Sequence, residues 1–298
     1  HVGAFKLAVE TRSDILPVLI SNSQACIPHK AYWIGDYQVV IRALPRVTPD
    51  AEVYSHGPRK LSKHVKKMLL AHVDQDWRLA QDGKAFWRNI RSFYNYRGAF
   101  VENYIAWKLR LDPIYRGIDE LVPREGTVLD LGSGYGLMSV ILARKSLLRQ
   151  VKGLDLDERK IRVCQEMARS LDNLQFHAEN FMEQSLPSAD AILMVDTLHY
   201  WSRNQQLDTI ATACAALNQH GTLVFREACK SNSWRHKIIY WGECFSVGTG
   251  HNRRGTELCF LSRESYLDAF SQHGLRLIAE PKGLGRGSNT VLVFRKES

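Results

Sequence analysis

The sequence has no long apolar run, no closely spaced cysteine pair and no internal repeat. Its longest apolar runs, such as ILPVLI and AILMV, are far shorter than the roughly 20 residues that a membrane-spanning helix requires. The six cysteines form no C-x-x-C pair, so they indicate neither a zinc site nor a disulfide framework, and we expect no metal. These absences favour a globular protein of the reducing cytoplasm.

Positive charge is abundant and unevenly placed. The net charge is +9, and residues 59–110 hold 12 Lys and Arg against 4 Asp and Glu, whereas residues 111–298 hold 23 against 22. The basic segment is also rich in aromatic residues, which suits peripheral contact with an anionic membrane. Nucleic acid is the competing partner, which we do not expect, and an ordinary amphipathic helix with solvated lysines is the simplest alternative.

Hydrophobic periodicity predicts two different regions. The first fifty residues read as a helix followed by two strands, and the pattern from residue 62 to residue 110 is helical. Further along, strands alternate with helices, which predicts a parallel sheet covered by helices. The last two predicted strands are joined by a glycine-rich loop too short for a crossover helix, so they should pair antiparallel. The seven predicted strands are 127–131, 150–156, 174–180, 189–196, 221–228, 275–280 and 290–296.

The stretch VLDLGSGYGLMSV, residues 128–140, joins the first of these strands to a helix. Its glycines Gly132, Gly134 and Gly136 allow the backbone to approach a ligand, and the helix that follows directs N–H groups at it. A dinucleotide site requires the spacing G-x-G-x-x-G, and here Leu137 occupies the position of the third glycine. The pattern therefore disfavours a dinucleotide.

Acidic and amide side chains follow the ends of neighbouring strands, where open α/β sheets bind their ligands. Asp155 is placed to accept both hydroxyls of a ribose. Glu179 and Asn180 are placed to contact an adenine edge, and Asp130 is placed to order the loop or to meet an ammonium group. A ligand with a ribose, an adenine and a positive charge but no phosphate is S-adenosylmethionine.

The segments VLDLGSGYG, GLDLDERKI, FHAEN and ADAILMVDTLHYW resemble, in order, the motifs of class I S-adenosylmethionine-dependent methyltransferases. The resemblance covers roughly residues 111–298. It implies an α/β, Rossmann-like sheet of seven strands with the last strand antiparallel. Carried over position by position, it implies cofactor binding by Asp130, Gly132, Ser133, Gly134, Gly136, Asp155, Leu156, Glu179, Asn180 and Asp196.

The implied activity is methyl transfer from S-adenosylmethionine to an oxygen or a carbon of a small-molecule or lipid-linked acceptor. Such a transfer requires mainly in-line placement of the acceptor, because the cofactor carries the reactivity. An oxygen acceptor also benefits from a general base, and His199, shortly after Asp196, is the candidate. Lining of the acceptor pocket is the alternative role of His199.

Further candidates flank the predicted sheet. Arg226 and Glu227 in the fifth strand and His236 beyond it are candidates for contact with the acceptor. The helix predicted before the first strand carries Tyr104 and Lys108, which either lie over the cofactor or simply pack. The span that follows the fifth strand is longer than a simple connection, so we expect it to cover the acceptor pocket.

The beginning of the chain resembles a different family. HVGAFKLAVETRSDILPVLI followed by IPHKAYWIGDYQVVIRALP is similar to the C-terminal half of lysophosphatidate-type glycerolipid acyltransferases over residues 1–75. Those enzymes use a His-x-x-x-x-Asp pair, and none of the eleven histidines here is followed by Asp at that spacing. We therefore expect no acyl transfer by this chain.

The predicted domain organisation joins these two resemblances. It comprises a partial α/β acyltransferase-like segment at 1–75, a basic and aromatic helical linker at 76–110, and a methyltransferase domain at 111–298. The alternative function is that of a truncated bifunctional acyltransferase–methyltransferase, whose main role is acyl transfer to a glycerolipid-type acceptor.

Overall fold

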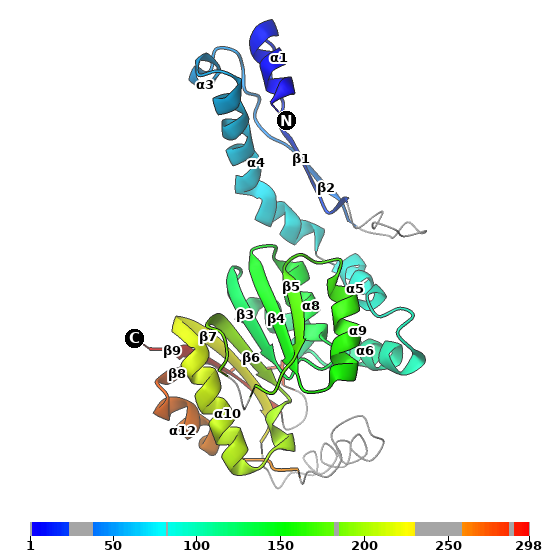
Figure 1. The fold of residues 1–298 in the computed structure, drawn as a ribbon, viewed down its shortest axis with the longest axis vertical. Coiled ribbons are helices and arrows are strands. Elements are labelled where there is room, and N and C mark those ends of the chain that lie inside the picture. The colour runs from blue at the N-terminus through cyan, green and yellow to red at the C-terminus, as the bar shows by residue number, and fades with distance from the viewer. Residues whose placement is uncertain are drawn as a thin grey trace. The chain divides into compact units, whose positions relative to one another are not determined.

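The structure, a computed structural model, describes residues 2–23, 38–81, 83–181, 185–229, 258–285 and 289–297 (Figure 1). The chain divides into two compact units, His1–Ser92 and Phe93–Ser298. The division falls inside the segment predicted as a linker. Among the helices in these ranges, none combines the length and the apolar character needed to cross a bilayer.

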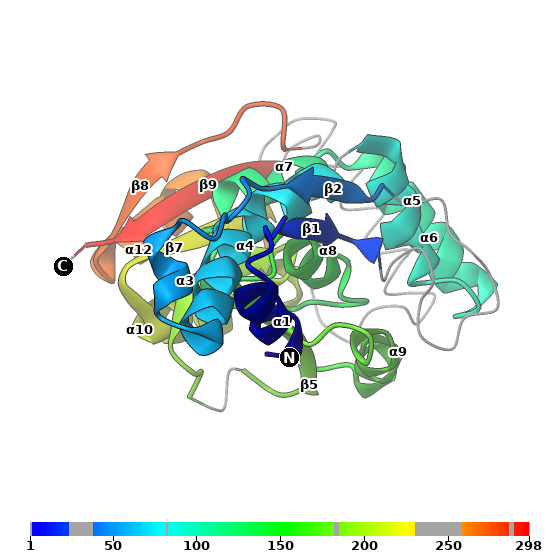
Figure 2. The ribbon, with the colours of Figure 1, turned by 90° about the horizontal axis from the view of Figure 1, so that it is seen from above.

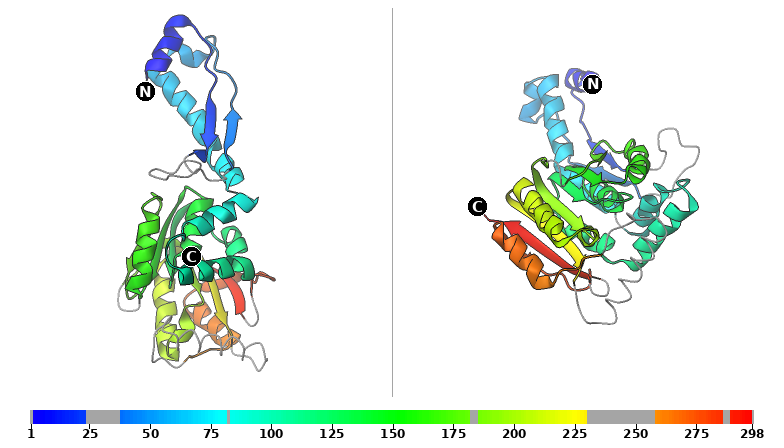
Figure 3. Two further views of the ribbon diagram at one scale, coloured as in Figure 1. Left: turned by 90° about the vertical axis from the view of Figure 1, so that its right-hand side faces the viewer. Right: turned by 60° about the horizontal axis from the view of Figure 1, so that its bottom comes forward.

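The first unit is a two-stranded sheet packed along a long helix. Its elements are α1 (Gly3–Thr11), β1 (Val18–Ser21), β2 (Val40–Ala43), α3 (Glu52–Ser55), α4 (Pro58–Ala80) and α5 (Gly83–Ser92). The left panel of Figure 3 shows α1 and the antiparallel pair β1–β2 alongside α4. Arg42 on β2 donates from Nε to the buried carboxylate of Asp76 on α4 at 2.7 Å, which joins the sheet to the helix.

The second unit contains the predicted alternation of strands and helices. Its strands are β3 (Gly126–Leu131), β4 (Arg149–Asp155), β5 (Leu174–Ala178), β6 (Ala189–Val195), β7 (Leu217–Ala228), β8 (Leu275–Ala279) and β9 (Asn289–Lys296). Its helices are α6 (Ala99–Leu111), α7 (Ile114–Leu121), α8 (Leu137–Lys145), α9 (Glu158–Ala168), the 3₁₀ turn η1 (Leu198–Tyr200), α10 (Arg203–Ala216) and α12 (Arg263–Gln272).

The seven strands form one sheet in the order β5-β4-β3-β6-β7-β9-β8. Strands β3 to β7 are parallel to one another, and β9 is antiparallel to both of its neighbours. Figure 2 shows β9 between β7 and β8. This arrangement confirms the predicted sheet. The strand order reverses between β3 and β6, so the carboxyl ends of these two strands form the switch point at which such sheets bind ligands.

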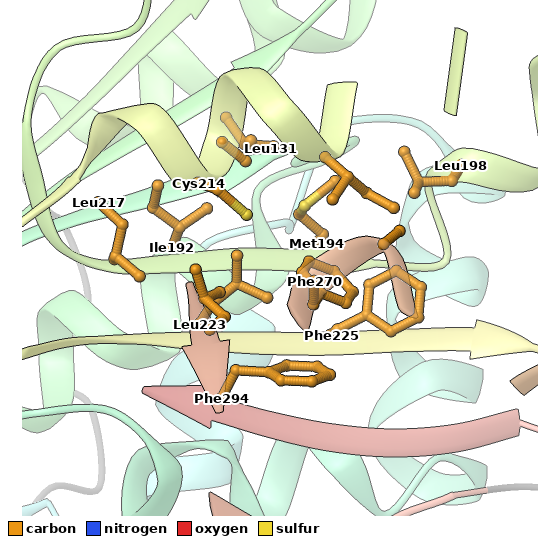
Figure 4. Close-up of a cluster of buried hydrophobic side chains, with 14 of the residues drawn as sticks. Leu131, Ile192, Met194, Leu198, Cys214, Leu217, Leu223, Phe225, Phe270 and Phe294 are labelled. Carbon is orange, nitrogen blue, oxygen red and sulfur yellow. The ribbon is translucent and has the colours of Figure 1, made fainter. Parts of the chain in front are cut away.

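A single apolar cluster fills the space between one face of the sheet, α10 and α12. Figure 4 shows that Phe225 of β7, Phe270 of α12 and Phe294 of β9 lie together. The ring centroids of Phe225 and Phe270 are 5.1 Å apart, and those of Phe270 and Phe294 are 4.4 Å apart. Because side chains alternate along a strand, Asp130 and Arg226 point to the opposite face. The cluster therefore supports the sheet directly beneath the strand ends.

We expect Phe270→Ala to destabilise the protein by about 3–5 kcal/mol, because the side chain is completely buried and its removal leaves a cavity. Leu147→Ala is the matched control, since Leu147 is exposed on the same unit. It should change the free energy of unfolding by less than about 0.5 kcal/mol. Urea unfolding followed by tryptophan fluorescence measures both, and similar losses in the two variants would contradict this placement of the core.

Candidate functional site

The glycine loop after β3 turns through backbone conformations that favour glycine. The φ angles of Gly132, Gly134 and Gly136 are 76°, 57° and 69°. A Cβ atom on Gly132 would lie 2.4 Å from the side chain of Thr197, and one on Gly136 would lie 2.4 Å from the ring of Phe176. A Cβ on Gly134 would meet no described atom within 4 Å. The outer two glycines therefore permit close packing, whereas the middle one faces open space.

Asp155 ends β4 beside this open position. Its Oδ2 accepts a hydrogen bond from the backbone N–H of Gly134 at 2.7 Å, and its Oδ1 accepts one from the N–H of Asp157 at 2.8 Å. A carboxylate offers about four lone-pair sites, so two further acceptor positions remain. The side chain is therefore held at a fixed place beside the loop and retains capacity for a ligand.

The other predicted cofactor residues lie around the same edge. The Oγ of Ser133 is buried without a hydrogen-bond partner in the described parts of the chain. Glu179 follows β5 and donates its backbone N–H to the carbonyl of Asp155 at 3.2 Å. Asn180, the residue after Glu179, and Leu156, the residue after Asp155, are both half-buried. An open loop, an anchored carboxylate and a buried hydroxyl without a partner suit a nucleoside that carries hydroxyl groups.

Asp130 lies at the base of the loop and is almost fully buried. Its Oδ2 accepts a hydrogen bond from the hydroxyl of Ser139 on α8 at 2.5 Å. Burial raises the pKa of Asp130 to about 6, and the negative charge of Asp155 adds to this effect, whereas the bond from Ser139 opposes it. Ionised Asp130 therefore destabilises the protein on its own and would be favoured by a nearby cation.

Buried Asp112 and Arg226 form a charge cluster with half-buried Lys108 and Asp196 at the ends of β6 and β7. The guanidinium of Arg226 donates to both carboxylate oxygens of Asp112, at 2.6 and 2.8 Å, and from Nε to Oδ1 of Asp196 at 3.0 Å. The Nζ of Lys108 lies 3.9 Å from Asp196. Burial alone would raise the pKa of Asp196, but Arg226 and Lys108 lower it below its usual value. Arg226, predicted to contact the acceptor, is thus engaged by two carboxylates.

Glu227 holds the segment that follows β6. Its Oε1 accepts from the backbone N–H groups of Thr197 and Leu198, and its Oε2 lies 2.6 Å from Nδ1 of His199. The side chains of His199 and Glu227 are 4% and 1% exposed. Thr197 also donates from Oγ1 to the carbonyl of Leu131 at 3.0 Å, which ties this segment to the glycine loop. Two predicted acceptor-site residues, His199 and Glu227, are therefore joined.

The sequence did not indicate several groups that complete this edge. Asp112 is 114 residues from its partner Arg226, and nothing in its local pattern marks it. Asn289, which donates to Asp196 at 3.2 Å, likewise belongs to no motif. The ring of Tyr104 on α6 lies 5.8 Å from that of Tyr135 in the glycine loop, a contact that agrees with either predicted role of Tyr104. His236 lies outside the described residues.

The sheet and the groups at its carboxyl edge define an α/β fold of the kind that binds ligands at the switch point. The chain belongs to the methyltransferase-domain family, whose model matches residues 106–280. A comparison with curated proteins finds no match. The family, together with a structural neighbour solved with S-adenosylmethionine, supports S-adenosylmethionine as the cofactor, which agrees with the sequence-based prediction.

Solved structures share this fold at low sequence identity. An O-methyltransferase family 2 protein from Planctomyces limnophilus, in complex with apigenin, is 20% identical with a TM-score of 0.53, covering 78% of this chain and 69% of that one. An O-methyltransferase family protein from Burkholderia thailandensis is 17% identical with a TM-score of 0.53, covering 80% and 71%. Human N-acetylserotonin methyltransferase, in complex with S-adenosylmethionine, is 14% identical with a TM-score of 0.50, covering 78% and 59%. The chain thus spans less than two thirds of this last protein.

We expect Asp130→Asn to stabilise the protein at neutral pH and to have little effect at pH 4. The folded-state pKa is raised from 3.8 to about 6, so the cost of ionising Asp130 is absent below pH 4 and complete above pH 6. The full difference is about 3 kcal/mol. Urea unfolding at pH 4 and pH 7 measures it, with exposed Asp172→Asn as the control. An equal offset at both pH values would contradict the raised pKa.

Proposed function

We propose that this protein transfers the methyl group of S-adenosylmethionine to a hydroxyl group of a small-molecule acceptor. The observation that carries the proposal is the buried pair of His199 and Glu227, joined at 2.6 Å, at the end of the strand next to the glycine loop. A histidine held by a carboxylate at this place is suited to accept the proton of an acceptor hydroxyl.

In this proposal the cofactor binds over the glycine loop. Gly134 leaves room for it, Asp155 accepts the hydroxyls of its ribose, and Glu179 with Asn180 lies at the adenine side. The negative charge of Asp130 is placed to be neutralised by a cationic ligand. When bound, S-adenosylmethionine supplies an electrophilic methyl group on a sulfonium.

The chain's own residues then handle the proton. With Nδ1–H donated to Oε2 of Glu227, the lone pair of His199 is on Nε2, which takes the proton from the acceptor hydroxyl. Glu227 stabilises the imidazolium that results, and it keeps its two bonds to the backbone of Thr197 and Leu198 throughout. Arg226 and Asp196 hold the ends of β6 and β7 in place around this pair.

The position of a base favours transfer to oxygen over transfer to carbon. The mitomycin 7-O-methyltransferase and the O-methyltransferase family 2 protein solved with apigenin are neighbours with the same fold. A lipid-linked acceptor stays an alternative within the same reaction. The alternative of acyl transfer has no support, since the family that matches, over residues 106–280, is a methyltransferase domain. The acyltransferase resemblance of residues 1–75 stays a prediction.

Asp155→Ala should weaken binding of S-adenosylmethionine by about 10-fold or more. The variant lacks the charged carboxylate to which the ribose hydroxyls donate in this proposal, and which the loop N–H of Gly134 holds in place. Asp172→Ala removes an exposed carboxylate from the same unit and should leave affinity unchanged. Isothermal titration calorimetry measures both. Equal affinities in the wild type and Asp155→Ala would exclude this carboxylate from the cofactor site.

His199→Gln should lower the rate of methyl transfer by about 100-fold or more while binding of S-adenosylmethionine is retained, since a base is lost and the loop is kept. Incubation with S-adenosylmethionine and a panel of small phenols, including apigenin, followed by mass spectrometry of methylated products, measures the rate. Exposed His273→Gln is the control. Turnover by His199→Gln at the wild-type rate would remove His199 as the base.

A further inference from the structure

The long helix α4 of the first unit carries cations on one side only. Five of them, called here the basic face, are exposed and lie in its first ten residues: Arg59, Lys60, Lys63, Lys66 and Lys67. At 3.6 residues per turn they occupy about one third of the helix circumference. The opposite side carries the buried residues Leu61 and Val65. Among the described residues, none of the five cations has an ion-pair partner.

The basic face is unfavourable for the folding of the unit that carries it. Cations near the start of a helix lie at the positive end of its dipole, and the first turn of α4 contains no acidic residue to offset them. Pairs such as Lys63 and Lys67, four residues apart, repel each other. Because no acidic residue in the first turn offsets this repulsion, the accumulated positive charge points to a partner outside the unit.

Charge complementarity identifies the partner as anionic, and one apolar residue identifies its kind. Leu70 falls within the arc of the basic face and is 59% exposed. A leucine among cations gains free energy when it enters the apolar boundary of a bilayer while the lysines contact lipid phosphates. Against nucleic acid the cations would serve equally well, but Leu70 would gain nothing from a phosphate backbone.

We propose that the basic face of α4, the long helix labelled in Figure 1, docks this protein on the surface of a bilayer that contains anionic phospholipid. The surface lies wholly within the first unit, on α4, and includes none of the residues assigned to the methyltransferase site. Membrane contact therefore adds to the proposed methyl transfer and does not depend on it.

The test is sedimentation of the full chain with phosphatidylcholine vesicles and with mixed phosphatidylcholine–phosphatidylserine vesicles. The wild type should bind the mixed vesicles and not the neutral ones. Lys63→Gln with Lys67→Gln should weaken binding about thirty-fold, since each basic residue near the surface contributes about five-fold. Leu70→Ser should also weaken binding although it leaves the charge unchanged.

The matched control is Lys6→Gln with Lys84→Gln, which removes the same charge from exposed positions on α1 and α5 of the same unit. It should retain most of the binding. Circular dichroism and calorimetry with S-adenosylmethionine verify that each variant is folded. Binding that ignores phosphatidylserine, or an equal loss in the control, would overturn the proposal.

Two further arms separate the other anions. A DNA duplex bound more tightly than mixed vesicles, and lost in the same double variant, would assign the basic face to nucleic acid and overturn the membrane proposal. Inorganic phosphate that displaces the protein from vesicles more strongly than chloride at equal ionic strength would assign it to free phosphate. Equal displacement by the two salts is the result expected for a bilayer surface.

Discussion

The guanidinium of Arg226 is the group on which the carboxyl edge of the sheet depends. It joins β7, the end of β6 through Asp196 and the segment between α6 and α7 through Asp112. Loss of this cation would leave the buried carboxylate of Asp112 without its bidentate partner, a situation that costs several kcal/mol in proteins. The turn that carries His199 follows β6, which this cluster joins to β7, and the glycine loop follows β3, which pairs with β6.

The glycine loop and the charge cluster solve opposite problems at the same edge. The loop needs open backbone at Gly134, which only a residue tolerant of positive φ supplies without filling the space. In the charge cluster, by contrast, the space is filled by four charged side chains that neutralise one another. Asp130 accepts its hydrogen bond from the hydroxyl of Ser139 rather than from a cation, and burial raises its pKa to about 6.

The features that the sequence predicted correctly are those set by residues close together in the chain. The seven strands, the parallel order and the antiparallel last pair follow from hydrophobic periodicity and loop length, and the loop glycines follow from their spacing. The strand limits differ by a few residues, as at β7, which begins at Leu217 because that residue pairs with Ala189 ahead of a register shift. Contacts such as Arg226 with Asp112 were missed, since they join residues 114 positions apart that no periodic signal connects. The pairing of Glu227 with His199 was missed for the same reason.

The place of β9 in the sheet has a consequence for how the chain matures. β8 is synthesised before β9, yet among the described strands it pairs with β9 alone, which lies between it and β7. During translation β8 therefore has no strand to pair with until β9 has left the ribosome, and β7 keeps one bare edge for the same time. An unpaired strand edge is prone to pair with other chains, so this sheet is vulnerable to such pairing until β9 has been synthesised.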